Sequence, residues 1–267
     1  MPDNPCLQPF FVDPEKPALI GVVHLAPLVG APRFGGDMGG VIENALMDAQ
    51  AIVEGGFDGL IVENFGDTPF WKDRSPPETI AAMTRCIVAI RDSFPGFPFG
   101  VNVLRNDAES ALGIAVATGA RMIRVNVLVG AAVTDQGIIE GNAATILRKR
   151  SALGANVAIW ADVTVKHAAP LGDQPLGQIA IDTVGRGMAD AVIVTGSGTG
   201  QPTSPTRLAV VRDAVAPTPT LIGSGATPET VRTTQASGFI IGTGLKQNGR
   251  VQIESVRMYT DARDRRK

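Results

Sequence analysis

Short apolar runs alternate with longer amphipathic segments along most of the chain. Most of the apolar runs carry no charge, which is typical of parallel strands buried on both faces, whereas the segments between them place apolar residues at helical spacing. The predicted strands are 18–23, 59–62, 99–101, 122–126, 157–162, 191–194, 220–222 and 238–241. This alternation predicts repeated strand–helix units around a parallel sheet.

The ends of the predicted helices are marked by residues that cap or stop a helix. Asn106 and Asp107 are suited to cap one helix, which Gly119 would end. The other predicted helices span 39–54, 76–93, 142–153 and 252–263, and two more begin at Pro175 and at 227–229. We expect long loops at 65–75 and around 134–137.

Eight such units in 267 residues match the size of a single (β/α)8 TIM barrel. The alternative, a doubly wound open sheet, would leave the eighth unit unused. We therefore predict one barrel domain over 18–267, and residues 1–17 as a proline-rich, disordered leader.

Composition adds limits on partners and location. Twenty-four basic and 26 acidic residues give a net charge of -2 without a basic tract, so nucleic acid is not an expected partner. Neither Cys6 nor Cys86 has a C-x-x-C neighbour, which disfavours a disulfide framework or a structural zinc site. Because we find no signal peptide and no apolar run long enough to span a membrane, we expect a cytoplasmic protein without membrane insertion.

Two glycine-rich turns near the end of the chain point to a phosphate site. Each follows a predicted strand, and such turns present clustered backbone N–H groups that bind phosphate. In a TIM barrel the loops after the seventh and eighth strands are the usual place for this site. The alternative is that the glycines only turn the chain. The residues expected to bind phosphate are Gly223, Ser224, Gly225, Gly242, Thr243 and Gly244.

Polar residues gather at the predicted carboxyl ends of the strands, where a TIM barrel has its active site. They are His24, Glu63, Asn64, Asn102, Arg105, Arg124, Asn126, Asp162, Thr164, Lys166, His167 and Thr195. Each has a structural alternative. A histidine can have a purely structural role in the core, and Asn102 and Asn126 can hold neighbouring loops together through side-chain hydrogen bonds. For Arg124, which lies within a strand just short of the mouth, an internal ion pair is the favoured use.

Asp162, Thr164 and Lys166 would lie on one side of an extended segment, because each is two residues from the next. An amine in a partly dry mouth can act as a base or form a Schiff base. The nearby carboxylate favours the ammonium instead, which could stabilise an oxyanion. The structural alternative is a buried salt bridge that only fixes a loop.

The residues at this end of the barrel also suggest two further sites. Glu63 and Asp162 could bind a divalent metal ion, with Asn64 or Asn126 supplying a carbonyl oxygen, although no fixed ligand spacing supports this. The glycine-rich segment 196–200 lacks the spacing of the nucleotide-binding motifs. A flexible active-site loop is the preferred interpretation of that segment.

The chain resembles the BtpA/SgcQ family through motifs that follow one another in order. These motifs are GVVHLAPL at 21–28, GLIVENFGDTPF at 59–70, GVNVLRND at 100–107, IRVNV at 123–127, TDQG at 134–137 with EG at 140–141, ADVTVKHA at 161–168, IVTG at 193–196, GSG at 223–225 and GT at 242–243. The resemblance covers nearly the whole chain after the leader. It implies a TIM barrel of the ribulose-phosphate-binding type, in agreement with the predicted fold.

The resemblance leaves two hypotheses for function. The family's namesake is a photosystem I biogenesis factor of cyanobacteria, and SgcQ-like members are associated with sugar-metabolism genes and have been labelled nucleoside triphosphatases. The absence of a Walker motif disfavours that label here. The first hypothesis is an isomerase, epimerase or lyase that acts on a phosphorylated sugar or related metabolite. The second is a non-enzymatic photosystem I factor that works through its surface. Its candidate contact is the loop 65–71, which an active-site lid or a subunit contact explains equally well.

In the enzyme hypothesis the residues divide into roles. Asp162 and Lys166 would perform acid–base or Schiff-base chemistry, assisted by Glu63 and by His24 or His167. The expected substrate-binding residues are Asn64, Asn102, Arg105, Asn126 and Thr195. No cofactor is expected beyond the divalent metal ion considered above. We expect a homo-oligomer whose ligand is a small phosphorylated metabolite.

Overall fold

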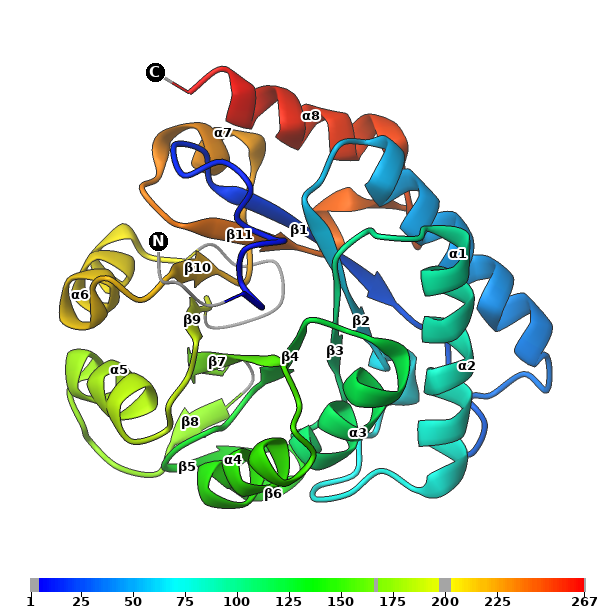
Figure 1. Ribbon diagram of the computed structural model, residues 1–267, viewed down its shortest axis with the longest axis horizontal. Coiled ribbons are helices and arrows are strands. Elements are labelled where there is room, and N and C mark those ends of the chain that lie inside the picture. Colours follow the sequence, from blue (N-terminus) through cyan, green and yellow to red (C-terminus); the bar gives the residue numbers. More distant parts are fainter. Residues whose placement is uncertain (1–4, 166–167, 197–202, 267) are drawn as a thin grey trace.

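Eight parallel strands close into a barrel, and helices surround it as an outer ring (Figure 1). The computed structural model describes residues 5–165, 168–196 and 203–266. Around the barrel the strands follow the order β1-β11-β10-β9-β7-β4-β3-β2. They are β1 (Ala18–His24), β2 (Gly59–Glu63), β3 (Phe99–Asn102), β4 (Met122–Val125), β7 (Ala158–Thr164), β9 (Ala191–Val194), β10 (Thr220–Ile222) and β11 (Gly238–Ile241). The predicted TIM barrel is confirmed.

A helix follows each barrel strand, as the amphipathic segments predicted. The helices are α1 (Met38–Glu54), α2 (Pro77–Ser93), α3 (Ala108–Thr118), α4 (Ala143–Ala152), α5 (Leu176–Gly185), α6 (Pro205–Val215), α7 (Pro228–Thr233) and α8 (Ile253–Asp264). The predicted caps of α3 are also present: the Asp107 side chain accepts a hydrogen bond from the Ser110 N–H, and Gly119 ends the helix in the left-handed region at φ 82°.

The leader is not disordered over the residues that the structure describes, which corrects our expectation. Phe10 and Phe11 are buried against Trp160 of β7, with ring centroids 5.1 and 5.8 Å apart. Phe10 also lies close to Gly59, the first residue of β2. The segment therefore closes the amino-terminal end of the barrel and completes its interior core. The sequence pattern did not reveal this, because five prolines and several charged residues surround a few apolar residues.

The predicted loop around 134–137 is a β-hairpin instead. Strands β5 (Ala131–Thr134) and β6 (Gly137–Glu140) pair antiparallel, and β8 (Ala168–Pro170) adds to β5 on its other side. The three-stranded sheet ties the loop after β4 to the loop after β7, beside the carboxyl ends of both strands. Apolar and polar residues alternate only weakly along these strands, and the strands are short. Their pairing therefore depends on the long-range contact between β5 and β8.

Two shorter features complete the described chain. Single turns of 3-10 helix follow β2 and β11, as η1 (Phe65–Asp67) and η2 (Thr243–Leu245). Strands β12 (Lys246–Gln247) and β13 (Arg250–Val251) form a small antiparallel pair before α8. Within the described ranges, none of the helices combines the length and the apolar character needed to cross a bilayer.

Candidate active site

Parallel register brings the last residues of the first three strands side by side. His24 of β1 pairs with Glu63 of β2, and Glu63 pairs with Asn102 of β3. Because these residues end their strands on the same edge, their side chains can meet at the carboxyl-terminal mouth of the barrel. The Asn102 amide donates to Glu63 Oε1 at 3.0 Å, and His24 Nε2 lies 3.7 Å from Glu63 Oε2.

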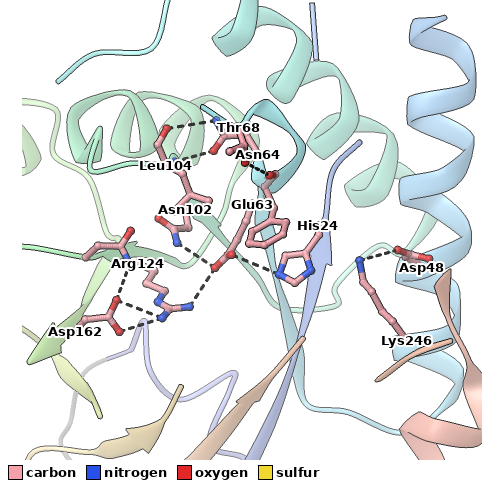
Figure 2. A network of polar contacts seen from close by, with 12 residues as sticks. His24, Asp48, Glu63, Asn64, Thr68, Asn102, Leu104, Arg124, Asp162 and Lys246 are labelled. Carbon is pink, nitrogen blue, oxygen red and sulfur yellow. Dashed lines mark hydrogen bonds and ion pairs between the residues drawn. The ribbon is translucent and has the colours of Figure 1, made fainter. Parts of the chain in front are cut away.

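A buried arginine links this group to the opposite side of the mouth (Figure 2). Arg124 of β4 donates to Glu63 Oε1 at 3.1 Å, and its other terminal nitrogen donates to both oxygens of Asp162, at 3.0 and 3.2 Å. The Asn126 amide also donates to Asp162, at 2.6 Å. The internal ion pair favoured for Arg124 is thus confirmed, and it bridges two carboxylates.

Burial and charge act in opposite directions on Arg124. Burial lowers the pKa of its guanidinium, but the adjacent Asp162 and Glu63 carboxylates outweigh this effect and raise the pKa above its ordinary value. The guanidinium therefore stays cationic, as expected of arginine in general. Arg124 is therefore the cation that the two buried carboxylates share.

The same bridge disfavours a metal ion between Glu63 and Asp162. Glu63 and Asp162 share Arg124 as their cation, so a metal ion between them would have to displace a buried guanidinium. Asn64, one of the two suggested carbonyl ligands, directs its oxygen to the Leu104 N–H at 2.7 Å. Among the residues that the structure describes, no three histidine, cysteine or acidic side chains are grouped closely enough to hold a metal ion.

Two of the predicted substrate-binding residues hold loops together in this structure. Asn64 bonds both the N–H and the carbonyl of Leu104 and donates to Asp67 at 3.1 Å. The Thr195 hydroxyl donates to the Thr164 carbonyl at 2.6 Å, which ties the ends of β9 and β7. Their polar groups are engaged by the protein, so a structural role accounts for both.

Arg105 is a second buried arginine beside the mouth. Burial lowers the pKa of its guanidinium, while Asp135 and Asp162 oppose that change. Its backbone N–H donates to the carbonyl of Trp71 at 3.3 Å, so the loop after β2 lies against the loop after β3. Two buried arginines thus approach the mouth from neighbouring strand ends, as the positions of Arg105 and Arg124 in the sequence predicted.

His24 is the most accessible member of the network around Glu63. Its side chain is 12% exposed, whereas those of Glu63 and Asp162 are 5% and 0% exposed. The imidazole packs against Phe65 with ring centroids 4.5 Å apart, and Gly242 lies close to the ring, since a Cβ there would come within 2.8 Å of His24 Cε1. The ring is held in place while part of its edge stays open.

One cavity joins the glycine turns to this network. It has a volume of about 240 Å³ and is lined by Gly223–Thr227 after β10, by Gly242–Gly244 after β11, and by His24, Glu63 and Arg124. The six residues predicted to bind phosphate therefore surround one space at the carboxyl end of the barrel. Positive charge reaches that space through Arg124, and an anion there would lie beside His24.

Tyr259 of α8 belongs to this cavity and was not predicted. Its hydroxyl donates to the Ala226 carbonyl at 2.9 Å and lies so close to Gly244 that a Cβ there would collide with it. It thereby connects the two glycine turns. Burial raises the pKa of this phenol, so it stays protonated. The only sequence signal was that Tyr259 is the single tyrosine of the chain.

Two predicted catalytic residues, Lys166 and His167, lie outside the described residues, as does most of the glycine-rich segment 196–200. The predicted alignment of Asp162 with Thr164 is interrupted by an irregularity in the pairing of β7 with β9. Thr164 accepts a hydrogen bond from Arg207 at 2.9 Å, while Asp162 faces Arg124.

Comparison with known proteins places the chain among named relatives. It is 46% identical to the photosystem I biogenesis protein BtpA of Synechocystis sp., with 90% of this chain and 85% of that protein covered. It is 47% identical to an uncharacterized protein of Thermococcus kodakarensis, with 91% and 92% covered. Phosphoribosyl anthranilate isomerase from Thermus thermophilus has the same fold at 12% sequence identity, with a TM-score of 0.55 and 92% and 97% covered.

The family comparison agrees with the motifs found at the strand ends. The sequence profile of the BtpA family matches residues 15–263, which includes every barrel strand and both glycine turns. The match begins within the segment that precedes β1. The chain therefore belongs to the BtpA family.

Proposed function

We propose that the protein is an enzyme that binds a phosphorylated sugar or related small metabolite at its glycine turns. In this proposal it moves a proton next to a carbonyl group or cleaves an aldol-type bond, as an isomerase, epimerase or lyase does. The observation that carries the proposal is the single cavity lined by both glycine turns and by His24, Glu63 and Arg124. In this proposal the phosphate site and the groups capable of proton transfer share one space.

His24 is our candidate for the group that exchanges a proton with the substrate. It is the most open member of the network, and Glu63 lies 3.7 Å from its Nε2. This is longer than a hydrogen bond, but such contacts often tighten when substrate binds. Glu63 would orient the imidazole and stabilise its cationic form. Arg124 would keep Glu63 ionised.

Asp162 takes a different part in this proposal from the one predicted. Its side chain is buried and bound by Arg124 and Asn126, so it would position Arg124 instead of meeting the substrate. Lys166 remains a proposed Schiff-base or acid–base residue, and His167 a proposed assistant. The roles of both residues rest on the sequence alone.

The phosphate part of the proposal can be tested by thermal unfolding with inorganic phosphate and a panel of sugar phosphates. A ligand that binds only the folded protein raises the melting temperature, and the rise grows with its concentration. Gly225→Ala and Gly244→Ala should abolish the rise, because Gly225 has φ 65° and a Cβ at Gly244 meets Tyr259. Gly113→Ala on α3, where the space is open, is the control. No rise with any compound of the panel would contradict phosphate binding.

A second candidate function comes from a relative. The Synechocystis protein that is 46% identical carries the name of a photosystem I biogenesis protein, so a non-enzymatic assembly role is our alternative. A scaffold acting through its surface does not need His24 or Glu63. Complementation of a strain lacking the gene separates the two: His24→Asn and Glu63→Gln should fail if the protein is an enzyme and succeed if it is a scaffold, provided that both variants fold.

A further inference from the structure

A second cavity lies on the other side of the Arg124 network from the glycine turns. It has a volume of about 480 Å³ and extends from Asn126 and Asp162 at the strand ends to Ala132 of the hairpin and Ile179 of α5. It is large enough for a ring system or a short alkyl chain. None of the roles proposed above uses this space.

The walls of the second cavity are mostly apolar. Aliphatic side chains from three separate elements contribute to them, including Val129, Ala132, Val163 and Ile179. The charged residues at its α5 side neutralise one another, since Arg186 lies 3.8 Å from Asp182 and Gln174 donates to the same carboxylate at 3.4 Å. The cavity therefore suits an uncharged group that can replace water on apolar surface.

Asn126 adds one polar requirement. Its amide nitrogen is committed to Asp162 at 2.6 Å, but its carbonyl oxygen is buried and accepts no hydrogen bond among the residues that the structure describes. The residue is only 4% exposed. A buried amide oxygen without a donor is costly, and structures seldom leave one unless a ligand or water supplies the donor. This oxygen belongs to a residue that lines the second cavity.

Arg124 relates the two cavities to each other. Its guanidinium lies 3.1 Å from Glu63, which lines the cavity of the glycine turns. It lies 3.0 Å from Asp162, which lines the second cavity. Arg124 thus connects a residue that lines one cavity to a residue that lines the other, and Figure 2 shows its contacts with both carboxylates. If one ligand occupied both cavities, its central atoms would lie beside the Glu63 and Asp162 carboxylates.

We propose that the second cavity binds the end of the substrate remote from its phosphate, and that this end is an uncharged aryl or alkyl group bearing an N–H or O–H donor for Asn126. That both ends belong to one molecule rests on the proposed phosphate-binding function. A simple sugar phosphate does not fit this description, because its hydroxyls would lose water against walls that offer few partners.

The two cavities can be tested separately with small probes and isothermal titration calorimetry. The probe for the second cavity is 2-naphthol, and the probe for the glycine turns is inorganic phosphate. Ile179→Trp should fill the cavity and weaken 2-naphthol binding by at least about tenfold, a loss of about 1.4 kcal/mol, while leaving phosphate binding unchanged. Ile181→Trp, at an exposed position of the same helix, should change neither.

The donor for Asn126 is tested with 2-methoxynaphthalene, which has the ring but no O–H. The wild-type protein should bind it about fivefold more weakly than 2-naphthol, since one net hydrogen bond contributes about 1 kcal/mol. Equal affinity for the two probes would overturn the assigned donor.

Each remaining outcome decides one part of the proposal. Failure of the wild-type protein to bind 2-naphthol, or unchanged binding by Ile179→Trp, would overturn the apolar subsite even if phosphate binds. Binding of 2-naphthol without any binding of phosphate would leave the subsite standing and remove the proposed phosphate function instead. If Ile179→Trp does not fold, Val129→Phe fills the cavity from the opposite wall and takes its place.

Discussion

Arg124 and Asp162 form a two-point contact in the barrel interior, with one guanidinium nitrogen 3.0 and 3.2 Å from the two carboxylate oxygens. The other terminal nitrogen of Arg124 reaches Glu63. All three side chains are buried. Their mutual attraction offsets the cost of removing three charges from water only while all three are present.

Replacement of Arg124 should therefore destabilise the protein strongly. In Arg124→Met the Glu63 and Asp162 carboxylates lose their cation in a dry interior, and we expect a loss of about 3–5 kcal/mol in the free energy of unfolding at pH 7. Urea unfolding followed by circular dichroism measures it. Adding Glu63→Gln and Asp162→Asn to Arg124→Met should restore much of the loss, because no charge is then left unpaired. A loss below about 1 kcal/mol for Arg124→Met would contradict this account of the bridge.

The leader should contribute to stability as part of the core. Phe10 is fully buried and packs edge to face on Trp160. Phe10→Ala would leave a cavity at the closed end of the barrel, and we expect it to lower the free energy of unfolding by about 3–5 kcal/mol. Val12→Ala is the control, because Val12 is exposed in the same segment. An equal, small effect of both substitutions would mean that the leader does not close the barrel in solution.

The strands and helices could be predicted because their patterns are local. A short apolar run such as Ala191–Val194 predicts a buried strand, and Asp107 and Gly119 mark the two ends of α3. The hairpin of β5 and β6 could not be predicted in this way, since its stability depends on pairing with β8, more than thirty residues later in the chain. Local pattern carries no information about such partners.

The same distinction between local and long-range information applies to the candidate site. The chain positions of His24, Glu63 and Asn102 at strand ends were enough to place them together, because the barrel register is regular. For Asp162 the sequence spacing suggested Lys166, which lies outside the described residues; the described partner is Arg124, which reaches Asp162 from the adjacent strand. A partner on another strand is found only from the barrel register, which spacing within one segment does not contain.

Both thiols should be unreactive in the folded protein. Burial raises the pKa of Cys86 to about 12 and also raises the pKa of Cys6, whose thiol contacts the Asn156 side chain at 2.8 Å. At pH 8 neither forms appreciable thiolate, which is the species that attacks a disulfide reagent. We expect no labelling by Ellman's reagent until urea unfolds the chain, when both thiols should react. Met47→Cys, at an exposed position of α1, should label at once in the folded protein. Fast labelling of the wild-type protein would contradict the burial of these thiols.

The last prediction concerns pH and the ion pairs of α3. Glu109 in its first turn accepts hydrogen bonds from Arg74 at 2.8 Å and from Lys149 at 3.3 Å. Burial raises the pKa of Glu109, but the bonds to Lys149 and Arg74 outweigh it and leave the pKa below its ordinary value of 4.5. A carboxyl whose folded pKa is depressed adds stability above its unfolded pKa, and this stability is lost as pH falls through the folded pKa.

Glu109→Gln should therefore lower the free energy of unfolding at pH 7, by about 0.5–1 kcal/mol because Arg74 is largely exposed to solvent. The difference from wild type should shrink as pH is lowered below 4.5, and urea titrations from pH 7 to pH 3 would measure it. Glu254→Gln provides a matched control, since Glu254 holds the same second position in α8 and shares only the favourable interaction with the helix dipole. If both substitutions lower the free energy of unfolding by the same amount at every pH, the ion pairs of Glu109 with Arg74 and Lys149 contribute nothing to stability.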